Sequence, residues 1–184
     1  MRLANEFSEI QSLGSDVGAL SVDPPDRNAA LARRWHLPFP IHSDPGGDWL
    51  LKQLDLWNPA DRGGIAWPAL LIFDAEGREV RRYRSRDFAD RSPNDDDLLS
   101  ALRALELPAI SVPTWTPDVE PVDDPGALRT ETFGPYFRGI RFGVRGLSGR
   151  LQNPVDQQEA IRMSDMATSF LDAWSTRRKA AETD

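Results

Sequence analysis

The sequence predicts an α/β fold followed by a pair of α-helices. Two short apolar runs, residues 17–22 and 70–73, have the length and composition of buried strands. Between and after them, apolar residues recur three and four positions apart, as in amphipathic helices. A stretch rich in proline and acidic residues, 108–132, interrupts both patterns. We therefore predict an α/β domain over residues 1–107, a strap over 108–132 and a helical hairpin over 133–184.

Helices and strands are expected to alternate in the first part of the chain. Residues 2–13 have apolar side chains at helical spacing and precede the strand at 17–22. Asp26 and Asp48 are each suited to cap a further helix, the second of which includes Trp57. A short extended piece is expected between these two helices.

A hairpin is predicted around Pro68. Proline lacks the N–H that a central strand donates and favours an extended residue before it, so Pro68 should start a strand directly after Trp67. Residues 70–73 are apolar without alternation, which is typical of a strand covered on both faces. Residues 74–77 form a turn signal that ends in glycine, and residues 79–84 supply the returning strand.

Three further helices are predicted after this hairpin. Acidic residues 95–97 suit the first turn of a helix that ends near Leu107. The spacing of apolar residues over 133–151 favours a helix. The alternative, a strand, is supported only by a brief alternation around Phe142. The last helix is predicted to follow Pro154 and to pair with the one before it.

The first helix of this predicted pair contains Gly139, Gly143 and Gly146. Each glycine costs roughly 1 kcal/mol relative to alanine, so we expect close packing against another backbone to compensate. The glycine spacing does not indicate a membrane span, because charged side chains in the same segment would be costly in lipid. These are Arg138, Arg141, Arg145 and Arg150.

The composition limits the partners and the chemistry. A formal charge of -7 argues against general attraction to nucleic acid or to anionic lipid. No run has the length and hydropathy of a membrane span, and the acidic first residues do not resemble a secretory signal, so we expect a cytoplasmic location. The chain contains no cysteine, which excludes disulfides, thiolate metal sites and any mechanism that uses a thiol of this chain.

No catalytic, metal or cofactor site is predicted from the remaining residues. His36 and His42 are the only histidines, and the nearby Asp44 and Asp48 lack the ligand spacing typical of metal sites. The pair Gly63-Gly64 precedes a predicted strand and not a helix, so it does not indicate a phosphate-binding loop.

Three short stretches carry a resemblance to a known family. They are ALSVDPP, FPIHSDP and GGIAWPALLIFDAEG, which begin at residues 19, 39 and 63. In this order they resemble the redoxin family, which includes alkyl hydroperoxide reductase and thiol-specific antioxidant (peroxiredoxin-like) proteins, within the thioredoxin-like superfamily. The resemblance covers residues 1 to about 107.

The resemblance implies an incomplete thioredoxin-like fold, in which helices flank a central sheet. In the family, a strand and a cysteine motif precede the helix that matches residues 2–13, and this chain contains neither. That strand would lie between the strands at 17–22 and 68–73. We expect these two strands to close up, that is, to pair directly with each other, or residues 109–115 to cover their exposed edges.

The resemblance also implies a binding site at Trp67 and Pro68. In thioredoxin-like proteins a cis-proline loop borders the active cysteine and presents backbone groups to a thiol partner, and Pro68 matches that proline. The sequence alone would make Pro68 an ordinary trans residue. The arginine that peroxiredoxins use near this strand has no match, because Arg62 is only a nearby loop residue.

The predicted function is that of a redoxin-like protein related to thiol-dependent peroxidases and disulfide oxidoreductases, inactive as written because it lacks cysteine. One expectation is that translation starts upstream of Met1 and supplies a cysteine motif. The alternative is a cysteine-free binding module that holds a partner, such as a protein thiol or disulfide, at Trp67 and Pro68 or through the helical hairpin. Residues 133–178 are expected either to mediate self-association or to pack on their own domain.

Overall fold

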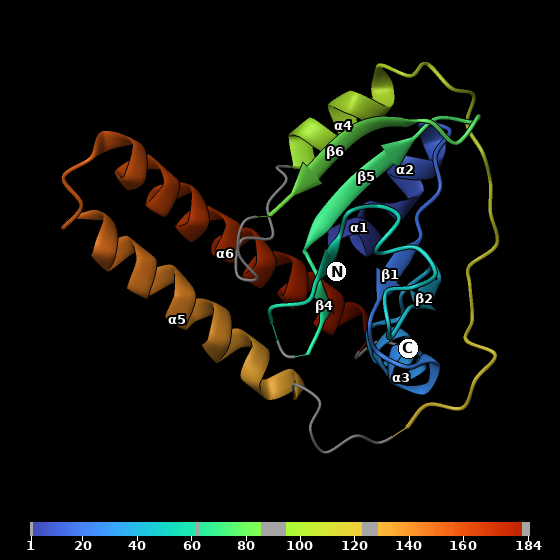
Figure 1. Ribbon diagram of the computed structural model, residues 1–184, viewed down its shortest axis with the longest axis horizontal. Helices are drawn as coiled ribbons and strands as arrows, with labels where there is room; N and C mark the ends of the chain where they lie inside the picture. Colours follow the sequence, from blue (N-terminus) through green and yellow to red (C-terminus); the bar gives the residue numbers. More distant parts are fainter. Residues whose placement is uncertain (1, 62, 86–94, 123–128, 182–184) are drawn as a thin grey trace. The chain divides into compact units, whose positions relative to one another are not determined.

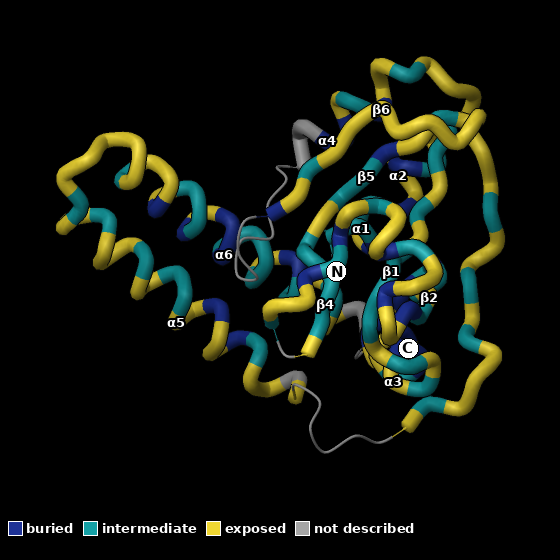
Figure 2. Tube along the Cα trace, viewed as in Figure 1, coloured by how far each residue is buried: buried dark blue, intermediate teal, exposed yellow. Residues whose placement is uncertain are grey.

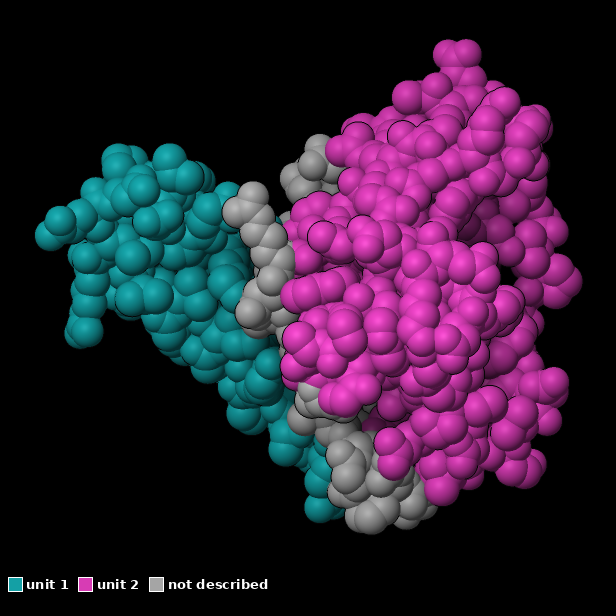
Figure 3. All heavy atoms as spheres, in the orientation of Figure 1, with its two compact units in different colours: residues 1–5, 124–184 teal, residues 6–123 magenta. Residues whose placement is uncertain are grey.

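The computed structural model of the protein describes residues 2–61, 63–85, 95–122 and 129–181 (Figure 1). Contacts within the chain divide it into two compact units (Figure 3). The first unit comprises residues 6–123, and the second joins residues 1–5 to residues 124–184.

All strands of the described residues lie in the first unit, where they form three separate two-stranded sheets. The strands are β1 (Ala19–Ser21), β2 (Ile41–Ser43), β3 (Trp57–Asn58), β4 (Ile65–Ala66), β5 (Ala69–Phe73) and β6 (Glu79–Arg84). β1 and β2 are parallel, whereas β3 with β4 and β5 with β6 are antiparallel. The predicted mixed α/β class is confirmed.

The prediction that the strands at 17–22 and 68–73 close up is wrong. Among the described residues, β1 pairs only with β2, and β5 pairs only with β6. Each strand therefore pairs with its neighbour along the chain, which is the arrangement that closes the shortest loops at the lowest cost in entropy.

α3 (Pro25–Trp35) connects the two parallel strands, as the sequence predicts. Proline suits the first helical position because its missing N–H would have no partner there. Asp26 lies inside the first turn and not before it. The buried Asn28 side chain donates hydrogen bonds to the Asp23 carbonyl at 3.2 Å and to Ser43 Oγ at 2.9 Å, which fixes the helix to the carboxyl ends of β1 and β2.

The helix predicted to follow Asp48 is absent, because residues 45–55 form a series of turns. Their backbone hydrogen bonds span three, four and five residues and not a constant four. Asp55, with φ of 54°, ends the series. Trp57 therefore lies in β3 and not on a helix. We call residues 45–55 the turn segment.

The hairpin of β5 and β6 is formed as predicted. Asp74 begins its turn by accepting the N–H groups of Glu76 and Arg78, and Gly77 has φ of 78°. The prediction that this apolar strand is covered on both faces is wrong, because only Ile72 is buried and Phe73 is 43% exposed. No strand of the described residues lies on the far side of β5, so the hairpin is only partly covered.

Trp57 packs against two glycines. A Cβ atom added at Gly47 or Gly64 would overlap carbon atoms of the Trp57 ring. Lys52 Nζ lies 5.2 Å from the centre of the same ring. Gly64 has φ of 119°, a backbone conformation that side chains with a Cβ rarely adopt.

We expect Gly64→Ala to destabilise the first unit by about 3 kcal/mol, because it combines backbone strain with overlap on the Trp57 ring. Urea unfolding followed by tryptophan fluorescence measures the loss. Gly63→Ala is the matched control, since Gly63 also has positive φ but has open space at its Cβ position, and we expect a loss of about 1 kcal/mol. Equal losses for the two variants would contradict the role given to the ring contact.

Helices of the first unit bury leucine, isoleucine and phenylalanine. α2 (Phe7–Ser12) buries Phe7 and Ile10. α4 (Asp95–Arg103) buries three leucines. They are Leu98, Leu99 and Leu102. The predicted helix over 2–13 is divided at Glu6. α4 includes the acidic residues 95–97 as predicted, and it ends at Arg103 and not near Leu107.

The strap runs along α2 and the loop before β2. Ile110 donates its N–H to the Gln11 carbonyl at 2.9 Å, and the Gln11 side chain donates to the Val112 carbonyl at 3.1 Å. Trp115 donates its N–H to the Pro38 carbonyl at 2.9 Å. The prediction that residues 109–115 cover the edges of the two strands is therefore wrong, because their hydrogen bonds are made elsewhere.

The second unit is the predicted helical hairpin, formed by α5 (Thr130–Ser148) and α6 (Pro154–Ala181), with α1 (Arg2–Asn5) against α6. Phe137 is buried between the two long helices, with ring centres 4.6 Å from Phe133 and 5.0 Å from Phe170. Within the described residues, no helix combines the length and hydropathy that crossing a membrane requires.

The predicted close packing of Gly139, Gly143 and Gly146 is wrong. No atom lies within 4 Å of the position that a Cβ would take at any of the three. Gly134 does pack closely, because its Cβ position is 3.1 Å from the Trp174 ring. The aromatic side chains on one side of α5 hold the hairpin together, and the three glycines lie on another side.

Candidate functional site

Trp67 and Pro68 lie between β4 and β5, and both are half-buried. Trp67 donates its N–H to the Leu56 carbonyl at 2.7 Å, and the Pro68 carbonyl accepts the N–H of Ser85 at 2.8 Å. The described residues contain no cis peptide bond, so the Trp67-Pro68 bond is trans. This corrects the cis geometry that the family resemblance implies. A binding role of the two residues stays a prediction.

The bond between Pro68 and Ser85 defines which edge of β5 is open. In an antiparallel pair, opposite residues alternate between those that exchange hydrogen bonds and those that do not. Pro68 faces Ser85 in the same register that pairs Leu70 with Tyr83, so Leu70 and Ile72 direct their backbone groups toward β6. The N–H and C=O groups of Ala69 and Leu71 therefore point away from β6. We call this row of backbone groups the outer edge of β5.

No described residue outside the hairpin donates a backbone hydrogen bond to Ala69 or Leu71 or accepts one from them. Ala69 is exposed and Leu71 is half-buried. An unpaired edge of this kind is a template for pairing with another extended segment. The outer edge of β5 is thus the candidate functional site of the first unit, and Trp67 and Pro68 stand at its beginning.

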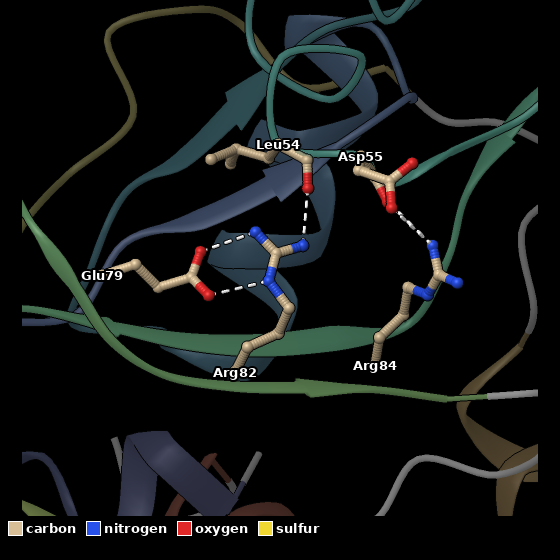
Figure 4. A network of polar contacts seen from close by, with 5 residues as sticks. All are labelled: Leu54, Asp55, Glu79, Arg82 and Arg84. Atoms are coloured by element: carbon tan, nitrogen blue, oxygen red, sulfur yellow. Dashed lines mark hydrogen bonds and ion pairs between the residues drawn. The ribbon is translucent and has the colours of Figure 1, made fainter.

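Two arginines of β6 hold the hairpin to the turn segment (Figure 4). Arg82 forms two hydrogen bonds with the Glu79 carboxylate, at 2.7 and 2.5 Å, and donates a third to the Leu54 carbonyl at 2.6 Å. Arg84 donates to the carbonyl and to the side chain of Asp55, at 3.0 and 3.1 Å. The bond to Arg82 lowers the pKa of Glu79, and the bond to Glu79 raises the pKa of Arg82. These contacts leave the outer edge of β5 free.

Asp44 organises the turn segment from its beginning. Its buried carboxylate accepts the N–H groups of Trp49, Leu50 and Leu51, at 3.1, 2.9 and 2.9 Å. Burial raises the pKa of Asp44, but the three N–H donors and the charge of Lys52 outweigh this effect and hold the pKa below its ordinary value. The carboxylate is therefore used for structure, and the turn segment that it orders carries the contacts to β6.

The other candidate residues of the sequence are not brought together. His42 packs edge-on against Trp49 with ring centres 5.7 Å apart, and Asp48 pairs with Lys52. His36 ends α3 with φ of 47°. In the part of the chain that the structure describes, no three histidine, aspartate or glutamate side chains form a group that could hold a metal ion. Arg62 lies outside the described residues.

No family model matches the chain, and no curated protein matches it significantly.

Sequence reasoning missed two features of the site. The open outer edge of β5 was not predicted, because a continuous apolar run indicates a strand with neighbours on both sides. The role of Asp44 had a local signal, since Asp44 precedes Pro45 and two glycines, and aspartate at the start of such a turn commonly accepts backbone N–H groups.

Proposed function

We propose that the chain is a redoxin-like protein with an incomplete thioredoxin-like fold that binds an extended segment of a partner protein. It uses no thiol chemistry of its own, because it contains no cysteine. The observation that carries the proposal is the outer edge of β5, where the backbone groups of Ala69 and Leu71 have no partner among the described residues. The bound segment adds a strand to the hairpin of β5 and β6.

The physical basis of this binding is strand addition. Main-chain hydrogen bonds to an exposed edge supply affinity, and side chains on alternate positions supply specificity. The edge of β5 is bordered by the half-buried Trp67 at one end and by Phe73, 43% exposed, at the other. These neighbours are apolar and uncharged, so the partner segment is expected to carry valine, isoleucine or threonine and few charges.

The resemblance to redoxins also supports the outer edge of β5 as the binding site. In that family a strand lies between the strands that β1 and β5 would match, and in this chain the corresponding side of β5 has no strand among the described residues. A partner segment at the outer edge would occupy that place. A protein thiol or disulfide on the partner would then lie close to Trp67 and Pro68, as the resemblance implies.

Amide hydrogen exchange tests the proposal residue by residue. In the free protein we expect slow exchange at Leu70 and Ile72, which bond to β6, and fast exchange at Ala69 and Leu71. A short peptide of alternating valine and threonine should slow exchange at Ala69 and Leu71 by about tenfold or more at saturation and leave the other two unchanged.

The variant Ala69→Pro removes an outward N–H without touching a bond to β6, so it should weaken peptide binding by about tenfold. Ala75→Pro is the matched control, because Ala75 lies in the exposed hairpin turn away from the edge. Slow exchange at Leu70 and Ile72 in both variants verifies that the hairpin is intact. Equal peptide binding by the two variants, or no added protection at Ala69 and Leu71, would show that the edge is not the binding site.

A further inference from the structure

α5 in the second unit has an apolar side that no described residue covers. Phe142 is 65% exposed, Leu147 is 52% exposed and Tyr136 is 47% exposed. Figure 2 shows exposed positions repeating along this helix. The buried aromatic residue of the helix, Phe137, contacts Phe170 of α6, so the exposed apolar side chains belong to a different side of α5.

Glycines make this side concave. Gly139, Gly143 and Gly146 have open space where a Cβ would lie, and their spacing of four and three residues places them on one side of the helix. Gly143 and Gly146 lie with Phe142 and Leu147 in the lining of a shallow hollow of about 300 Å³. We call this feature the α5 groove. A helix with small residues on its surface permits close approach of a second backbone.

Positive charge borders the groove. Arg150 belongs to its lining, and Arg138, Arg141 and Arg145 lie along the same helix. None of these four arginines forms an ion pair with a described residue. Glu131 is the one acidic residue within Thr130–Ser148, and it pairs with Arg129 at 3.9 Å. The local excess of positive charge contrasts with the formal charge of -7 for the whole chain.

We propose that the α5 groove binds an α-helix of a partner protein that has small apolar residues on one face and acidic residues beside that face. The hollow over the glycines accepts the apolar ridge of the partner helix, and Phe142 and Leu147 pack on its sides. The arginines pair with the acidic residues, which gives ion pairs to side chains that form none with the described residues of this unit; Arg141 Cζ itself lies 4.6 Å from the centre of the Phe142 ring and so keeps positive charge beside the groove.

The charge pattern favours an acidic partner over a second copy of this chain. Pairing two α5 helices would gather the arginines of both copies, and α5 has no free acidic residue to offset them. The glycines also distinguish the groove from a membrane-binding face, because they remove apolar surface from the side that would enter the lipid. The proposal concerns the second unit only and does not depend on the binding site at β5.

Two synthetic helical peptides with the same alanine and leucine face test the proposal. One carries glutamate beside that face and the other carries lysine, and fluorescence anisotropy measures their binding to the 184-residue chain. The glutamate peptide should bind at least about tenfold more tightly than the lysine peptide, and added salt should reduce the difference. No binding of the glutamate peptide, or equal binding of both, would overturn the proposal.

Gly143→Leu should weaken binding of the glutamate peptide by about tenfold or more, since the new side chain fills open space in the groove without disturbing the fold. Gln158→Leu, at an exposed position of α6, is the matched control and should bind as the wild type does. Arg145→Glu should also weaken binding, whereas the control Arg81→Glu, in the first unit, should not.

Two other results would assign the groove to a different occupant. Sedimentation that shows a dimer abolished by Gly143→Leu would identify a second copy of the chain. Binding to vesicles with anionic lipid that is lost in Gly143→Leu, with no peptide binding, would identify a membrane surface. Either result would overturn the proposal of a partner helix.

Discussion

Replacing Phe137 by alanine is expected to destabilise the hairpin of α5 and α6 by about 3–5 kcal/mol. Phe137 is 7% exposed, and its ring centre lies within 5.1 Å of the ring centres of Phe133, Tyr136 and Phe170. Truncation removes these contacts and leaves a cavity, because the surrounding aromatic rings belong to two different helices and cannot all move inward.

Circular dichroism during urea unfolding measures this loss, since both long helices contribute strongly to the signal. Phe142→Ala is a control of the same residue type on the same helix, and its side chain is 65% exposed. We expect that control to change the stability by less than about 1 kcal/mol. Similar losses for the two variants would contradict the assignment of Phe137 to the core of this unit.

The second large effect is expected from Asp44→Asn in the first unit. The amide nitrogen of asparagine cannot accept a hydrogen bond, so at least one of the three N–H groups of Trp49, Leu50 and Leu51 loses its partner. The turn segment should then loosen, and with it the contacts of Leu54 and Asp55 to β6. Thermal unfolding should show a midpoint lowered by several degrees.

This variant should also change the dependence of stability on pH. The pKa of Asp44 is lower in the folded protein than its ordinary value, so its charged form is favoured by folding. Its contribution is fully present above the ordinary aspartate pKa of about 3.9 and is lost as the pH falls through the lowered pKa. The Asp44→Asn variant should therefore lose less stability than the wild type as the pH falls from about 5 to 2. This is roughly the range over which an aspartate with a lowered pKa takes up its proton.

Asp48→Asn is the matched control for both measurements. Asp48 is exposed and pairs with Lys52 on the surface, where an ion pair contributes little. The acid response of the wild type also includes Asp74 and Glu79, whose pKa values are lowered by their bonds to Arg78 and Arg82. The comparison therefore rests on the difference between the two variants. An identical acid response of Asp44→Asn and Asp48→Asn would contradict the role given to Asp44.

The proposed binding edge and the α5 groove have a common physical origin. In each case one side of a secondary structure element bonds to or packs on a neighbour in its own unit. Another side of the same element has no partner among the described residues. β5 bonds to β6 through Leu70 and Ile72, and its opposite edge is open. α5 packs on α6 through Phe137, and its glycine side is open.

Sequence reasoning was most accurate where the signal lies within a few residues. The start of β5 directly after Pro68 and the turn from Asp74 to Gly77 depend on local backbone conformation. The helices α5 and α6 follow from apolar spacing over several turns. It was wrong at residues 45–55, where turns replace a helix, because the hydrogen bonds of Asp44 and the position of Trp57 between two glycines depend on tertiary contacts.

The sequence by itself determined the α/β class, the hairpin at Pro68, the helical hairpin at the carboxyl end and the absence of a thiol. Only the tertiary structure decided that the strands form separate pairs and that Gly139, Gly143 and Gly146 face open space. The reason is physical. Periodicity and turn chemistry act between residues close in the chain, whereas strand pairing and helix packing depend on which distant surfaces meet.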